Sequence, residues 1–220
     1  SSQARGAAAA LYISSGGPVA RRHGGASAGG RRDWANSLLD GIIGEQASAR
    51  ELLILCRARL PQFDAANALA VAQRLARVAP SAEDGIVAPR CDLRDSAELQ
   101  QRLVQHVKSE FKAQHLAATA WAYAKLSWND KQLLESISAA ALPQIWNFRH
   151  PDLAGMAWSY AVLSIRDWPL LEAIASASLM IIDDFNAQSL ANTAWSCAKL
   201  LFCDEPLLEA LSCRAMNTMS

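Results

Sequence analysis

The sequence lacks most of the motifs by which enzymes, metal sites and membrane proteins are recognised. It has no run of 18 apolar residues, so we expect no membrane span. Its five cysteines form no CxxC pair, which argues against a zinc site and a disulfide framework, and we expect reduced, mostly buried thiols. There is no GxGxxG, GxxxxGK or HExxH, and no histidine stands at ligand or triad spacing. We therefore predict no catalytic residue, metal, cofactor or small-molecule substrate.

Net charge is also absent, because 21 basic residues balance 21 acidic ones. The balance hides an asymmetry, since residues 1–32 contain arginine but no acid, whereas the remainder is mildly acidic. Residues 1–32 are rich in Gly, Ser and Ala, a composition typical of a transit peptide or its remnant. We expect this extended basic arm to become ordered only along RNA or another subunit, and the alternative is an unstructured terminus without a role.

What the sequence does have is an internal repeat with a period of 37 residues. It defines three units at residues 111–147, 148–184 and 185–220. Each unit opens on a phenylalanine, and leucine, tryptophan and alanine recur at fixed places within it. The agreeing columns include Phe111, Phe148 and Phe185; Leu116, Leu153 and Leu190; Trp121, Trp158 and Trp195; Ala124, Ala161 and Ala198; and Leu133, Leu170 and Leu207.

Each unit reads as two helices joined by a short turn, because its apolar residues recur at helical spacing. We call them the first and the second helix. Asp130, Asp167 and Asp204 stand where a carboxylate suits the start of a second helix. A single pair cannot bury its own apolar stripe, so the units must stack. The predicted fold class is all-α, an α-solenoid of stacked helix-turn-helix repeats.

The three repeated tryptophans, Trp121, Trp158 and Trp195, fall in the apolar register of the first helix. We therefore expect all three to be buried in equivalent places between helices. Trp128, Trp146 and Trp168 lie outside this column, and we consider turn capping or surface recognition for them.

Upstream, residues 33–110 carry degenerate helical repeats. Residues 60–78 match the first helix, and a second helix is expected at about 95–109. The segment between them contains Pro and Gly, so it reads as a loop inserted at 80–95. Another helix pair is expected within 34–60.

The phrase FNAQSLANTAWSCAKL at 185–200 resembles the first helix of the organellar helical-hairpin repeat families. These are the octotricopeptide repeats of about 38 residues and the heptatricopeptide repeats of about 37 found in RAP-domain and FAST-kinase-like proteins. The resemblance implies an α-solenoid that binds RNA in mitochondria or plastids and acts in transcript stability, processing, translation or ribosome assembly. No RAP domain follows the repeats, so the nuclease-like activity attributed to that domain is not implied.

If the solenoid reads nucleotides, polar side chains at equivalent positions of the first helices should do so. The same positions would also vary on any solvated face, and an acidic body gains little from counterion release. The RNA-binding candidates are Gln114, His115, Lys125, Gln188, Asn192 and Lys199 on the first helices, with Arg21, Arg22, Arg31 and Arg32 in the arm.

Two hypotheses for function follow. The first is an organellar RNA-associated repeat protein, a subunit of a ribonucleoprotein such as the mitochondrial ribosome or an RNA processing or stability factor. The alternative is a structural scaffold that holds other proteins of a large complex without reading RNA. We favour the ribonucleoprotein subunit, with organellar rRNA or mRNA and protein subunits as partners. We expect it in mitochondria, with plastids as the alternative.

Overall fold

The computed structural model describes residues 65–78, 101, 103–107 and 111–219, all within the unit Ser48–Ser220. Every regular element among these residues is a helix, as the repeat predicts. The predictions for the arm, for the helix pair within 34–60 and for the loop at 80–95 lie outside the described residues.

The first helices are α4 (Ala65–Val78), α6 (Ala113–Lys125), α8 (His150–Val162) and α10 (Ala187–Leu200). The second helices are α7 (Lys131–Ala141), α9 (Trp168–Met180) and α11 (Glu205–Met219), and two short 3-10 helices, η3 (Leu142–Asn147) and η4 (Ile182–Asp184), follow α7 and α9. Residues 101 and 103–107 are helical, which agrees with the second helix expected at about 95–109. None of the described helices has the length and apolar character that crossing a membrane requires.

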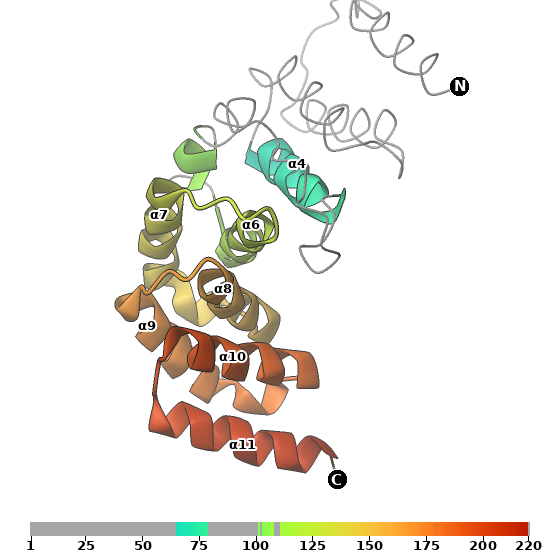
Figure 1. Ribbon diagram of the computed structural model, residues 1–220, viewed down its shortest axis with the longest axis vertical. Helices are drawn as coiled ribbons and strands as arrows, with labels where there is room; N and C mark the ends of the chain where they lie inside the picture. Colours follow the sequence, from blue (N-terminus) through green and yellow to red (C-terminus); the bar gives the residue numbers. More distant parts are fainter. Residues whose placement is uncertain (1–64, 79–100, 102, 108–110, 220) are drawn as a thin grey trace, which may run out of the picture. The chain divides into compact units, whose positions relative to one another are not determined.

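The first helices pack side by side. Helix α8 lies between α6 and α10, and α6 also packs against α4 (Figure 1). Each of α7, α9 and α11 packs on the first helix that precedes it. The repeated leucines form the core, because burying them removes their side chains from water. The buried leucines of the repeat columns are Leu116, Leu153 and Leu190 on the first helices and Leu133, Leu170 and Leu207 on the second.

The second helices begin where the sequence predicts. The side chain of Asp130 accepts a hydrogen bond from the Leu133 N–H at 3.1 Å. Asp167 does the same for the Leu170 N–H at 3.1 Å, and Asp204 repeats the arrangement before α11. A carboxylate in this position satisfies a backbone donor that has no partner inside the helix.

Helices α6, α8 and α10 end in one shared geometry. After α6, the Ser127 N–H donates to the Ala124 carbonyl at 3.1 Å and the Trp128 N–H donates to the Tyr123 carbonyl at 2.9 Å. This pair of bonds is the Schellman motif, and α8 and α10 end with the same pair. The motif needs a left-handed residue, which is here not glycine. The left-handed residues are Ser127 (φ 54°), Ser164 (φ 57°) and Leu201 (φ 57°).

The repeated tryptophans are not core residues, so the prediction of their burial is wrong. Trp195 is 45% exposed, and Trp121 and Trp158 are half-buried. All three indoles keep some contact with solvent, although Gln73 and Arg77 of α4 lie near Trp121. The buried indole is that of Trp128, outside the repeat column, whose ring meets Tyr123 edge-on with centroids 5.4 Å apart.

The cysteines also differ from the expectation of mostly buried thiols. Cys197 is buried on α10, but Cys203 and Cys213 are exposed. Cys203 lies in the turn before α11, and Cys213 lies on a face of α11 that nothing described covers. All three thiols are free, as expected.

Candidate nucleic-acid interface

One face of α6, α8 and α10 is at least partly open to solvent from end to end. Four positions per helix, spaced at i, i+4, i+7 and i+11, share this face. None of their residues is buried, whereas the neighbouring leucines of the same helices are. We call this surface the open face. It consists of Gln114, Ala118, Trp121 and Lys125 on α6; Pro151, Gly155, Trp158 and Val162 on α8; and Gln188, Asn192, Trp195 and Lys199 on α10.

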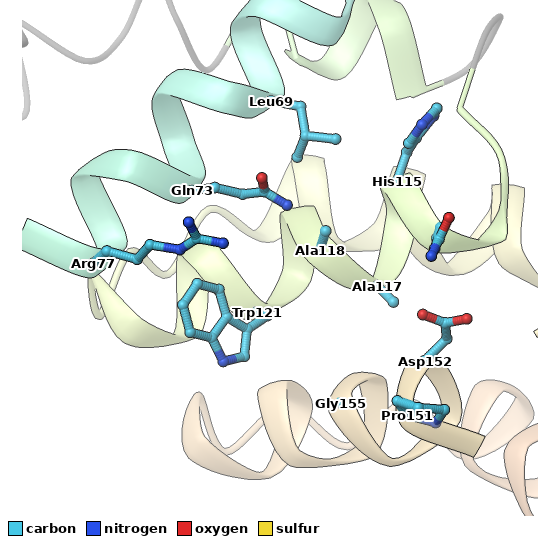
Figure 2. Close-up of a pocket in the computed structure, with 11 residues that line it drawn as sticks. Leu69, Gln73, Arg77, His115, Ala117, Ala118, Trp121, Pro151, Asp152 and Gly155 are labelled. Carbon is cyan, nitrogen blue, oxygen red and sulfur yellow. The ribbon is translucent and has the colours of Figure 1, made fainter. Parts of the chain in front are cut away.

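A groove of about 520 Å³ opens where α4, α6 and α8 meet (Figure 2). Figure 2 shows Arg77 and Gln73 extending from α4 toward Trp121 of α6. Within the described part of the chain, Arg77 forms no ion pair. The groove therefore combines an aromatic ring, an amide and a guanidinium, which are groups that contact bases and phosphates in RNA-binding proteins, with the carboxylate of Asp152, which is paired with Arg149.

Gly155 keeps the far side of this groove open. A Cβ atom added at Gly155 would meet no other heavy atom within 4 Å. A Cβ atom at Gly155 would therefore stand in open space beside α8.

His115, a candidate from the sequence, lies at the other end of the groove and serves first as a helix cap. Its Nδ1 atom accepts a long hydrogen bond from the Lys112 N–H at 3.4 Å, and its ring meets Phe111 edge-on. At the equivalent place on α8, a carboxylate oxygen of Asp152 accepts from the Arg149 N–H at 3.2 Å. His115 and Asp152 are both half-buried, and they lie beside the open face rather than on it.

Charge is divided between the two kinds of helix. The first helices carry four basic residues and one carboxylate, that of Asp152, which is paired with Arg149 at 3.4 Å. The open face itself carries Lys125 and Lys199 and no carboxylate. The excess of acid lies on the second helices and η4, at Glu135, Glu172, Asp183, Asp184, Glu205 and Glu209. Most carboxylates of the described helices thus lie on helices other than those that form the open face.

The sequence-derived candidates fall into three groups in the structure. Gln114, Lys125, Gln188, Asn192 and Lys199 lie on the open face, and His115 lies beside it. Arg21, Arg22, Arg31 and Arg32 lie outside the described residues.

Sequence reasoning missed four side chains of this surface: Arg77 and the three repeated tryptophans. The spacing along the helix could have predicted that the tryptophans lie on this surface. Trp121 comes seven residues after Gln114 and four before Lys125, so the three residues share one helical face. Nothing in the sequence of α4 alone places Arg77 beside them, because that proximity depends on the packing of α4 against α6.

The described residues offer no comparable set of side chains for catalysis. They contain no group of three or more His, Cys, Asp or Glu side chains that could hold a metal ion. Burial raises the pKa of the Cys197 thiol to about 11, so it is protonated at neutral pH and a poor nucleophile. Burial also raises the pKa of Tyr123 and of Tyr160. These groups are core residues.

A comparison with known families gives one match. The model of the family described as "RNA-editing substrate-binding complex 6 protein" matches residues 96–220, more than half of the chain. The matched part contains α6 to α11 and hence the open face. No curated protein matches the sequence significantly.

Proposed function

The chain belongs to the RNA-editing substrate-binding complex 6 protein family, and we propose that it is a non-catalytic subunit that holds RNA on its open face. The complex named in this description is the mitochondrial RNA-editing substrate-binding complex of kinetoplastids. Membership favours RNA processing over the ribosome and mitochondria over plastids. The partners are then the other proteins of the complex and the guide and messenger RNA that it handles.

The observation that supports the proposal is the composition of the open face. It presents amides, indoles and two lysines without a carboxylate. Most of the carboxylates lie on the second helices instead. Phosphate contacts by cations and stacking on aromatic rings are the two main ways in which proteins hold single-stranded RNA.

We further propose that the matched part is a solenoid of the heptatricopeptide or octotricopeptide type, with units of 37 residues. Three local features support this reading. The carboxylates that cap the second helices, the Schellman motifs and the open-face tryptophans all recur at this spacing. A structural repeat would place each nucleotide of a bound strand against equivalent side chains.

The test is a titration of the full chain with labelled single-stranded RNA at several salt concentrations. Because each lost phosphate contact lowers the salt slope by about 0.7, we expect the double variant Arg77→Ala with Lys125→Ala to bind more weakly and with a shallower slope. Lys131→Ala is the matched control, since Lys131 is equally basic and exposed but lies on α7 beside Glu135. It should bind like the unmodified chain.

The contribution of the arm is measured in the same titration by replacing Arg21, Arg22, Arg31 and Arg32 together with alanine. If only the arm variant loses binding, the open face is not the RNA site. If the unmodified chain binds no RNA and keeps its partners after nuclease treatment of the complex, the scaffold hypothesis replaces the proposal.

A further inference from the structure

We propose that Trp121, Trp158 and Trp195 form a row of stacking platforms for the unpaired bases of single-stranded RNA, an inference that rests on the proposed function. The row runs across α6, α8 and α10, one indole from each helix. In this proposal the tryptophans, rather than the polar side chains at equivalent positions of the first helices, are the principal base contacts.

Ring pairing and hydrogen bonding within the described residues do not account for the three indoles. Within the described residues, none of them pairs with another aromatic ring, and none of their N–H groups donates a hydrogen bond. Trp128 shows the contrasting case, because it is buried and packs against Tyr123. Trp195 is 45% exposed and Trp121 and Trp158 are half-buried, so part of each indole stays in water, and a stacked base would cover it.

The spacing of the helices suits bases rather than another indole. Helices that pack side by side have axes about 8–10 Å apart, so indoles on neighbouring first helices are too far apart to stack on one another. That separation leaves room for a base between them. The residues three positions before the indoles of α6 and α8 are Ala118 and Gly155, which carry a methyl group and no side chain respectively, and a Cβ added at Gly155 would meet no heavy atom within 4 Å.

The surroundings of each indole supply the rest of a single-strand site. Lys125 and Lys199 come one helical turn after Trp121 and Trp195, where an exposed ammonium group can meet a phosphate. Asn192 comes one turn before Trp195 and can bond to a base edge. Since every base has a π-face, stacking tolerates many sequences, and that suits a protein that must hold RNAs of different sequence.

The proposal is tested on the full chain with two probes of equal charge, an oligouridine of about 12 nucleotides and an abasic oligoribose phosphate of the same length. Trp158→Ala should weaken oligouridine binding about tenfold and leave the weaker binding of the abasic probe unchanged. Trp158→Phe should retain most of the affinity, because a phenyl ring also stacks. Trp121→Ala and Trp195→Ala should behave like Trp158→Ala.

One variant serves as a control, and another tests the position of the row. Trp146→Ala removes an indole that is 63% exposed but lies on η3, off the open face, and it should leave binding unchanged. Gly155→Glu places a carboxylate in empty space beside Trp158, so it should weaken oligouridine binding while the melting temperature stays near that of the unmodified chain.

The outcomes separate the inference from the proposed function. If the tryptophan variants bind oligouridine normally while Arg77→Ala with Lys125→Ala does not, the face holds phosphates only and the stacking row is wrong. If the tryptophan variants lose a protein of the complex but keep RNA, the row is a protein contact and the inference is overturned. If neither probe binds the unmodified chain, the proposed function itself fails.

Discussion

Tyr123 and Tyr160 occupy equivalent buried positions on α6 and α8 but differ in one hydrogen bond. The Tyr160 hydroxyl donates to the Leu134 carbonyl at 2.7 Å in the core. The Tyr123 hydroxyl is buried and has no hydrogen-bond partner among the described residues. A buried polar group without a partner loses its hydration and gains nothing in return, whereas a bonded one stabilises the fold modestly.

This difference predicts opposite effects of the same substitution. Tyr160→Phe should lower the free energy of unfolding by about 1 kcal/mol, because it removes a buried hydrogen bond. Tyr123→Phe should leave stability unchanged or raise it. Urea unfolding of both variants gives the comparison, and equal losses in the two would show that the hydroxyl of Tyr123 has a partner in solution.

At the scale of the helix, α6, α8 and α10 end in a conformation that their residues do not favour. Left-handed backbone costs a residue with a Cβ about 1–2 kcal/mol, and glycine is the usual occupant of this position in a Schellman motif. Ser127, Ser164 and Leu201 adopt it nevertheless, because the two backbone bonds of the motif and the contact of the following side chain fix the turn.

Leu201→Gly should therefore stabilise the protein. The Leu201 side chain is 74% exposed, so its removal forfeits little burial, and relief of the strained φ should raise the free energy of unfolding by about 0.5–1 kcal/mol. Leu201→Ala is the control, since alanine keeps the strain, and it should change stability little. A loss of stability in Leu201→Gly would mean that the leucine side chain holds the turn against α11.

At the scale of the whole molecule, the buried ionisable groups predict how stability depends on pH. Cys197, Tyr123 and Tyr160 all have a raised pKa in the folded chain, because burial disfavours their charged forms, with the nearby carboxylates of the second-helix caps adding to the effect. Their ordinary pKa values are 9.0 for the thiol and 10.0 for the phenols. Above pH 9.0 the unfolded chain thus loses protons that the folded chain retains.

Stability should accordingly be complete below pH 9.0 and fall as the pH rises toward 11. The Cys197 part of this decline is isolated by Cys197→Ala, which should flatten the curve between pH 9.0 and 11, whereas Cys203→Ala at an exposed thiol should not. The measurement is the urea midpoint as a function of pH. A curve of unchanged shape in Cys197→Ala would exclude this thiol as a cause.

The sequence by itself determined the helices and most of their ends. Apolar periodicity depends only on a residue's neighbours along the chain, and so does a cap such as Asp130 or Asp167, which bonds three residues ahead. The left-handed residues at the helix ends were the local feature that the sequence did not predict, because Ser164 and Leu201 stand where glycine is usual.

Only the tertiary structure decided which apolar side chains are buried. Ala161 is buried against Leu200 because α10 covers that side of α8, whereas Ala198, the same column one unit later, is exposed where no described helix covers α10. In the same way, Trp158 stands in the apolar register of its helix but remains only half-buried. Periodicity reports that a position is apolar, and burial depends on the neighbour that packs against it.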